Sequence, residues 1–164
     1  MDVVTASRLQ ELLDYNPHTG IFTRLKGVKG YSVGSKVGSV NSDGYLRIMI
    51  DGRKYQSHRL AFLWMTGDWP KDEVDHIDGE RMNNRWDNLR EATQSQNQAN
   101  SKIKSTNTSG LKGASFHKQR QKWLAQIQIN SRQRFLGYFD TKEEAHESYC
   151  SAAIKLQGEF ARFA

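Results

Sequence analysis

The chain has 164 residues, 37% of them apolar and 10% aromatic, which allows one domain or two small ones with modest cores. No apolar run reaches the roughly 18 residues of a membrane span, and the N-terminus lacks a basic-then-apolar signal pattern, so we expect a soluble cytoplasmic protein without membrane contact. The single cysteine, Cys150, excludes an internal disulfide and a four-cysteine zinc site.

The net charge of +6 is unevenly distributed along the chain. Residues 1–100 carry 13 basic and 13 acidic side chains, whereas residues 101–164 carry 11 basic and 5 acidic ones. Between Glu91 and Asp140 there is no acidic residue. This asymmetry favours a polyanionic partner for the C-terminal part, and a merely solvated basic face is the other interpretation.

The first third of the chain predicts a helix and two hairpins. Residues 7–13 form a short amphipathic stretch, and the Pro17 to Gly20 turn joins two short strands. The segment from 26 to 44 is rich in glycine and lysine and predicts a loop or a poorly regular sheet that could lie along DNA. Alternating residues 45–50 and 53–57 around Asp51-Gly52 predict a type I′ hairpin, and residues 58–65 a helix closed by Gly67.

The segment from 74 to 100 holds most of the candidate chemistry. Asp75-His76 is followed by Asn88 and then Asn97. This set suits phosphodiester hydrolysis, because a hard divalent cation takes oxygen ligands and a neutral imidazole accepts a proton from water. An ordinary polar loop and helix is the alternative interpretation.

Together with Asn83-Asn84-Arg85 and Gln96-Asn97, this pattern resembles the HNH nuclease family in its phage and homing-endonuclease branch. The final motif residue of that family is often His, and Asn97 is the variant of the homing branch. The resemblance implies a strand-strand-helix (His-Me finger) centre, with strands at 74–77 and 88–90. A helix capped by the Thr93-x-x-Gln96 capping box follows.

The resemblance also implies the roles of the residues. His76 would be the general base, and Asp75 and Asn97 would hold one divalent cation, Mg²⁺ or Mn²⁺. Asn88 would bond across the loop and fix the histidine. Asp78 and Glu80 are expected to be surface or supporting groups. We expect Arg47 and Arg59 to contact DNA, and His58 to make a structural hydrogen bond.

Residues 101–109 predict a linker. The segment after it contains the motifs Gly113-Ala-Ser-Phe-His, Lys122-Trp-Leu-Ala-Gln-Ile and Phe135-Leu-Gly-Tyr-Phe-Asp. Through these motifs, residues 110–164 resemble the plant ethylene-response-factor (APETALA-type) DNA-binding domain. Residues 123–129 alternate between packed and free positions. A capping box at Thr141 and an apolar stripe that includes Ala145, Tyr149, Ala153 and Leu156 predict a helix covering the sheet. The expected DNA contacts are Lys112, Ser115, Lys118, Arg120, Lys122, Gln126, Gln128, Arg132 and Arg134.

The sequence thus predicts an α+β protein with an endonuclease domain at 1–100, made of hairpins over 12–57 and a nuclease motif over 74–100, then a linker and a DNA-binding domain at 110–164. The predicted function is metal-dependent cleavage of double-stranded DNA by a phage or homing-type enzyme, acting inside a bacterial host as a monomer or a homodimer on DNA. A catalytically inactive DNA-binding regulator is the alternative, and an RNA-binding protein is disfavoured because no aromatic stacking platform stands out.

Overall fold

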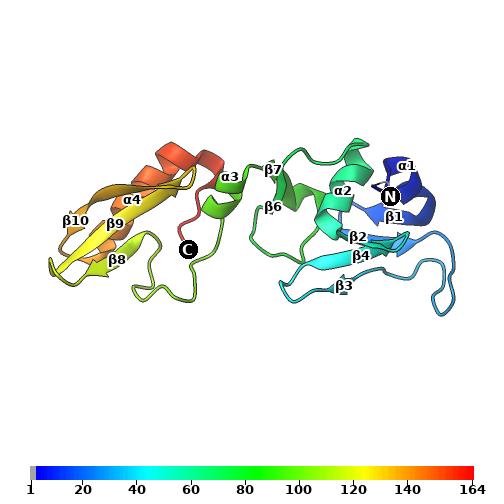
Figure 1. The fold of residues 1–164 in the computed structure, drawn as a ribbon, viewed down its shortest axis with the longest axis horizontal. Helices are drawn as coiled ribbons and strands as arrows, with labels where there is room; N and C mark the ends of the chain where they lie inside the picture. Colours follow the sequence, from blue (N-terminus) through cyan, green and yellow to red (C-terminus); the bar gives the residue numbers. More distant parts are fainter. Residues whose placement is uncertain (1–2) are drawn as a thin grey trace. The chain divides into compact units, whose positions relative to one another are not determined.

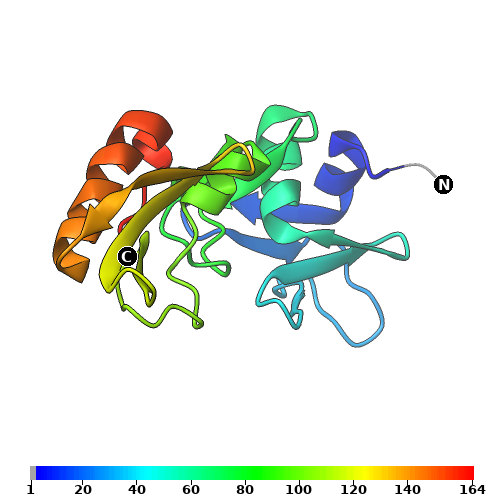
Figure 2. The same ribbon diagram turned by 60° about the vertical axis from the view of Figure 1, so that its left-hand side comes forward.

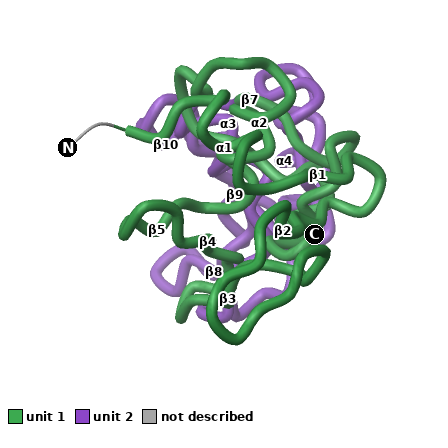
Figure 3. The backbone as a smooth tube through the Cα atoms, turned by 90° about the vertical axis from the view of Figure 1, so that its right-hand side faces the viewer, with its two compact units in different colours: residues 1–91 green, residues 92–164 purple. Residues whose placement is uncertain are grey.

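The computed structural model describes residues 3–164, and packing divides the chain into two compact units. Unit 1 ends at Glu91 and unit 2 is Ala92–Ala164, as the two colours of Figure 3 show. Packing therefore assigns the helix after Thr93 to unit 2. The sequence-based division at residues 100 and 110 stays a prediction.

Unit 1 consists of small antiparallel sheets and short helices (Figure 1). Strand β1 pairs with β2, strands β3, β4 and β5 form one sheet in that order, and β6 pairs with β7. One apolar core, with Leu9, Phe22, Ile48 and Leu60 at its centre, joins these elements. In chain order the elements are α1 (Ala6–Leu12), β1 (Leu13–Asn16), β2 (Ile21–Arg24), β3 (Ser39–Val40), β4 (Leu46–Ile50), β5 (Arg53–Gln56), α2 (Ser57–Thr66), β6 (Glu73–His76), η1 (Trp86–Asn88) and β7 (Leu89–Ala92).

The predicted hairpin at Asp51-Gly52 is confirmed. Both residues have positive φ, 48° and 78°, as a type I′ turn requires. Ile48 and Ile50 on one face are 1% and 3% exposed, whereas Met49 on the other face is 62% exposed. The hairpin therefore has one core face and one free face, which carries Arg47.

One predicted boundary of unit 1 changes. Within residues 26–44, where a loop or a poorly regular sheet was expected, the short strand β3 pairs with β4. The second strand of the nuclease segment was expected to begin at Asn88, but Asn88 closes the 3-10 turn η1 and the strand begins at Leu89. The side chain of Asn88 is used within the preceding loop, which keeps this residue out of the strand.

The turn between β1 and β2 is packed against the nuclease segment of unit 1. Gly20 has a φ of +70°, and a Cβ built there would lie 2.3 Å from the carbonyl carbon of Asn84. Real Cβ atoms do not approach backbone so closely, so only glycine fits. The turn thereby fixes the position of the loop that carries Asn84.

Unit 2 is a three-stranded antiparallel sheet in the order β10, β9, β8, with helix α4 along one face (Figures 1 and 2). Ala114, Ala125 and Ala145 allow the helix to approach the sheet closely. The predicted sheet with a covering helix is confirmed, and so is the capping box at Thr141. The elements are α3 (Gln94–Ala99), β8 (Ala114–His117), β9 (Lys122–Ile129), β10 (Arg132–Phe139), α4 (Lys142–Gln157) and η2 (Gly158–Phe160).

Two details of unit 2 depart from simple periodicity. A β-bulge between Phe135 and Gly137 shifts the register, so Phe139 packs against the core although Phe135, which has the same parity in the sequence, is 61% exposed. Leu156, expected in the covered stripe of α4, is 43% exposed, because the last helical turn runs past the cluster of Ile127, Tyr149 and Ala153.

Helix α3 has only six residues, and unit 2 holds it in place. The predicted capping box at Thr93 is confirmed, and Ala92 and Ala99 pack with Phe160. The amide of Asn130 donates to the Ser95 hydroxyl at 3.0 Å. Because an isolated helix of this length is unstable in water, α3 depends on these contacts. Among residues 3–164, no helix is long and apolar enough to cross a membrane.

Replacing Gly20 with alanine should destabilise unit 1 strongly. The matched control is Gly30→Ala, since Gly30 also has positive φ (+85°) but nothing lies within 4 Å of its Cβ position. We expect a loss of about 1 kcal/mol in unfolding free energy for Gly30→Ala and about 2 to 4 kcal/mol for Gly20→Ala, measured by urea denaturation. Equal losses in the two variants would show that the contact with Asn84 carries no strain.

Candidate active site

Strand β6 ends in Asp75 and His76, and each of these residues is 4% exposed. The loop after this strand closes on itself, since the Ile77 amide donates to the Asn88 carbonyl at 2.9 Å. The loop therefore leaves β6 and enters β7 at neighbouring points of the same small sheet.

A side-chain hydrogen bond determines which nitrogen of His76 is basic. The Nε2 atom of His76 lies 3.2 Å from the Oδ1 atom of Asn84. The amide nitrogen of Asn84 donates to the Met82 carbonyl at 3.3 Å, so the oxygen of this amide faces the imidazole. An amide oxygen only accepts, and Nε2 must therefore carry the proton. In the neutral ring Nδ1 then has the lone pair that can take a proton.

Asn84 itself is 2% exposed and rigidly held. The Tyr15 hydroxyl donates to its carbonyl oxygen at 2.7 Å, and Gly20 packs against its backbone. Sequence reasoning included Asn84 in the motif without giving it a role. The structure identifies it as the partner of His76.

Asn88 organises the loop. Its amide nitrogen donates to Asp78 Oδ1 at 3.0 Å and to the Asn83 carbonyl at 2.8 Å, and its oxygen accepts from the Asp78 amide at 3.0 Å. The expected bonding of Asn88 across the loop is present. The side chain that hydrogen-bonds to His76 is that of Asn84, whose oxygen accepts from Nε2. Although burial alone would raise the pKa of Asp78, hydrogen bonds from Asn83, the Glu80 amide and Asn88 lower it, so Asp78 supports the loop as a carboxylate.

Asp75 is paired with Arg90 of β7. Both Nε and Nη2 of the guanidinium lie 2.9 Å from Asp75 Oδ2, and the two side chains are only 14% and 5% exposed. Sequence reasoning did not single out Arg90. Its guanidinium balances the charge of a carboxylate that burial would otherwise destabilise.

The ring of His76 packs against a second buried imidazole. His58 lies 4.9 Å from His76 between ring centroids, at 80°, and Tyr45 lies 5.3 Å from His58. The structural hydrogen bond expected for His58 is absent at Nδ1, which is buried without a partner among the described residues. Burial, assisted by the charges of His76 and Arg59, lowers the pKa of His58 to about 3. Burial also lowers the pKa of His76, and the hydrogen bond to Asn84 opposes this effect. Both rings are therefore neutral near pH 7.

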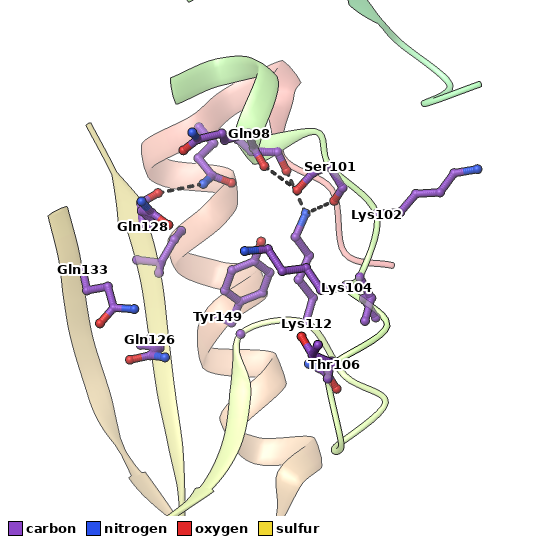
Figure 4. Close-up of a pocket in the computed structure, with 16 residues that line it drawn as sticks. Gln98, Ser101, Lys102, Lys104, Thr106, Lys112, Gln126, Gln128, Gln133 and Tyr149 are labelled. Atoms are coloured by element: carbon purple, nitrogen blue, oxygen red, sulfur yellow. Dashed lines mark hydrogen bonds between the residues drawn. The ribbon is translucent and has the colours of Figure 1, made fainter. Parts of the chain in front are cut away.

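Two predicted phosphate contacts are engaged within the protein instead. Arg59 donates to the carbonyls of Asp72 and Pro70 at 2.8 and 3.3 Å, which closes the segment between α2 and β6. The Lys112 ammonium donates to the carbonyls of Ala99 and Ser101 at 2.8 and 2.5 Å, where α3 ends (Figure 4). Burial, with the charge of Arg162, lowers the pKa of Lys112 to about 8. These bonds give both residues a structural role, and their contacts with DNA stay a prediction.

The sheet of unit 2 separates the remaining predicted DNA contacts onto two faces. Register places Ser115, Gln126 and Gln128 on the face away from α4. Arg132 and Arg134 pair with Ile129 and Ile127 and so lie on the opposite face, where both are exposed. Gln126 and Gln128 line a cavity of about 320 Å³ together with Lys102 and Lys104 (Figure 4).

The face with the glutamines also carries exposed aromatic rings, which sequence reasoning missed. Phe135 and Tyr138 are 61% and 37% exposed, and their rings lie 5.0 Å apart. The Arg120 guanidinium stacks over the Tyr138 ring at 4.9 Å. Of the other predicted basic contacts, Lys118 directly follows β8, and Lys122 forms a salt bridge with Asp140. The expectation that no aromatic platform stands out was wrong.

Asn97 lies on α3 in unit 2, and Asp75 lies in unit 1. Their shared role as metal ligands stays a prediction. Among the described residues, no group of three or more His, Cys, Asp and Glu side chains could hold a metal ion.

Comparisons with known proteins identify the family of the segment that contains this site. A family model described as HNH endonuclease matches residues 55–99. Protein 3.8 of Escherichia phage T7 is 39% identical over 90 residues, covering 55% of this chain and 74% of that protein. The chain belongs to the HNH endonuclease family. An uncharacterized HNH endonuclease of Acanthamoeba polyphaga mimivirus is 35% identical over 116 residues, 70% of this chain and 59% of that relative.

This chain is also similar to a solved structure that describes DNA binding and cleavage by the HNH homing endonuclease I-HmuI. The identity is 28% and the TM-score 0.42, and the match covers 57% of this chain and 53% of that one. The HNH family match ends at residue 99, so the resemblance of residues 110–164 to the ethylene-response-factor domain stays a prediction.

The buried His58 predicts a specific loss of stability in acid. Its pKa of about 3 in the folded state lies below the ordinary value of 6.5, so the unfolded chain binds a proton first as pH falls from 6.5 towards 3. At pH 4.5 this difference removes about 2 to 3 kcal/mol of stability relative to pH 7. In His58→Phe, which keeps a ring in the site, the loss between these pH values should be smaller by that amount.

The matched control is His18→Gln, because His18 is exposed on a turn. Urea denaturation at both pH values gives the comparison. If His58→Phe loses as much stability in acid as the wild type, His58 is not held neutral in the folded state.

Proposed function

We propose that this chain is a metal-dependent endonuclease that hydrolyses phosphodiester bonds of double-stranded DNA, with His76 as the general base. The observation that carries the proposal is the geometry of His76, whose Nε2 is engaged by Asn84 while Nδ1 keeps its lone pair. The same histidine follows Asp75 directly and lies inside the segment that matches the HNH family. The similarity to a phage protein and the name of I-HmuI support a phage or homing-type enzyme.

The protein groups act on the proton of the attacking water. Nδ1 of His76 takes this proton as the water oxygen bonds to phosphorus, and the imidazolium that forms still donates from Nε2 to Asn84. The Asn84 oxygen that accepts from Nε2 interacts more strongly with the charged imidazolium than with the neutral ring. Asn84 therefore stabilises His76 more after proton transfer than before it. The bond to the 3′ oxygen then breaks and this oxygen takes a proton from solvent water, which leaves a 5′ phosphate and a 3′ hydroxyl, while His76 returns its proton to solvent.

The residues fit one hard divalent cation, Mg²⁺ or Mn²⁺. Asp75 offers a carboxylate and Asn97 an amide oxygen, donor types that both ions accept. Mg²⁺ commonly keeps waters and binds substrate phosphate oxygens, which would complete its coordination. When bound, the ion would supply charge stabilisation for the pentacovalent phosphorus and the leaving oxygen. Arg90 holds Asp75 in place through Oδ2.

We propose that unit 2 brings the nuclease to its target. Residues 101–164 hold the whole positive excess of the chain, and the face with Gln126 and Gln128 is free of the covering helix. Glutamine side chains can pair with adenine, and the exposed ring of Phe135 can contact apolar groups of bases. A protein with a single catalytic set would nick as a monomer and cut both strands as a homodimer.

Two other functions follow from the same surfaces. A catalytically inactive DNA-binding regulator would not need the Asp75-His76 pair or its supports Asn84 and Arg90, all of which are present. An RNA-binding role gains support from the exposed Phe135 and Tyr138 rings, since aromatic side chains stack on unpaired bases. Competition between duplex DNA and single-stranded RNA for the protein separates these targets.

His76→Ala should abolish cleavage without loss of DNA affinity. A general base typically contributes about 10² to 10⁴ in rate, and neutral His76 adds no charge to binding. Nicking of supercoiled plasmid and anisotropy with a labelled duplex measure the two quantities, with His18→Ala as the control on an exposed histidine. Turnover of His76→Ala at the wild-type rate would refute the assignment.

Asp75→Asn should raise the Mg²⁺ concentration needed for cleavage and lower the maximal rate, because a neutral amide binds the cation less strongly than a carboxylate. Asparagine keeps an oxygen towards Arg90, whereas alanine would leave that guanidinium buried and unpaired. Asp51→Asn is the control, since Asp51 is an exposed carboxylate that also pairs with an arginine. Cleavage by EDTA-treated protein at the rate of the Mg²⁺-loaded protein would contradict the metal's role.

A further inference from the structure

A second basic site lies on unit 1. A cavity of about 250 Å³ opens on the free face of the β4–β5 hairpin, which carries Arg47 and Lys54 on neighbouring strands. Arg24 at the end of β2 and Tyr31 from the loop before β3 complete its wall. Three positive side chains from different strands therefore line one hollow, and no Asp or Glu is among the residues that line it.

These three cations are unpaired. None of Arg24, Arg47 and Lys54 forms a salt bridge or donates a side-chain hydrogen bond within residues 3–164. The Arg24 guanidinium stacks over the Tyr31 ring at 4.9 Å, and its Nε is buried without a partner. The ring thus holds Arg24 in position without neutralising its charge.

Other arginines of unit 1 contrast with this arrangement. Arg8 pairs with Asp51 and Glu11, and Arg85 pairs with Asp87. Residues 1–100 contain as many acidic as basic side chains, so acids for pairing are not scarce. The cavity keeps three like charges together, and such a cluster is stabilised when an anion binds among them.

We propose that this cavity binds backbone phosphates of DNA and gives unit 1 a contact with the nucleic acid outside the active site. Arginine donors match phosphate oxygens in a forked geometry, and Lys54 adds a point charge. Tyr31 and Met49, which are 58% and 62% exposed, offer apolar surface to the sugars beside those phosphates. The choice of DNA as the polyanion rests on the proposed function, whereas the phosphate site itself rests on the cavity.

The test is the salt dependence of DNA affinity. Anisotropy of a labelled duplex is measured in EDTA, which prevents cleavage, at several salt concentrations for wild type, for Arg24→Gln/Arg47→Gln/Lys54→Gln, and for Arg8→Gln/Arg85→Gln. Each lost phosphate contact should reduce the slope of log affinity against log salt by about 0.9, so the cavity variant should lose about 2 to 3. The control variant should keep the wild-type slope, because its arginines are already paired.

A charge-preserving variant, Arg24→Lys/Arg47→Lys, should retain most of the slope, and thermal melting checks that each variant is folded. Inorganic phosphate titrated at constant ionic strength should compete with DNA less effectively against the cavity variant than against wild type. A wild-type slope in the folded cavity variant would overturn the proposal, even if inorganic phosphate or an acidic peptide binds there. Since no step requires cleavage, failure of the nuclease assignment would appear in the His76→Ala experiment and not in these slopes.

Discussion

The hydrogen bond between His76 and Asn84 is the interaction on which the site depends. It determines the tautomer of the imidazole and therefore which nitrogen can receive a proton. The bond is reliable only because Asn84 cannot move, since Tyr15 holds its carbonyl and Gly20 packs on its backbone. In the proposed mechanism, the N-terminal hairpin thus positions the general base through Asn84, although it contributes no group to the chemistry.

Charge is arranged differently around the site and at the proposed DNA contacts. Near the site, Arg90 balances Asp75, and burial keeps His76 and His58 neutral, so a water can meet an uncharged base. Away from the site, residues 101–164 carry an excess of basic over acidic side chains, and no Asp or Glu lines the cavity around Arg47. This separation allows attraction to a polyanion without protonation of the base that must act on it.

Local sequence signals predicted much of the fold, because their physics is short-range. The Asp51-Gly52 turn, the capping boxes at Thr93 and Thr141 and the glycine cap at Gly67 all act within a few residues. The Asp75-His76 motif was likewise visible, and the family comparison supports it.

Long-range features could not be predicted in this way. Asn84 acquires its role from Tyr15 and Gly20, which are far away in sequence. The bulge after Phe135 shifts the register, and alternation alone could not place Phe139 on the packed face while Phe135 lies on the other face. Lys112 carries the charge of a phosphate ligand, but tertiary structure turns its ammonium towards the end of α3.

The central claim is that Asn84 fixes His76 as the tautomer with a proton on Nε2. Ring nitrogen-15 chemical shifts of His76, from long-range proton–nitrogen correlation spectra near pH 8, report this directly. The account predicts a protonated Nε2 and an unprotonated Nδ1 in the wild type, and a mixture of both tautomers in Asn84→Ala. A protonated Nδ1 in the wild type, or the same spectrum in both proteins, would contradict it.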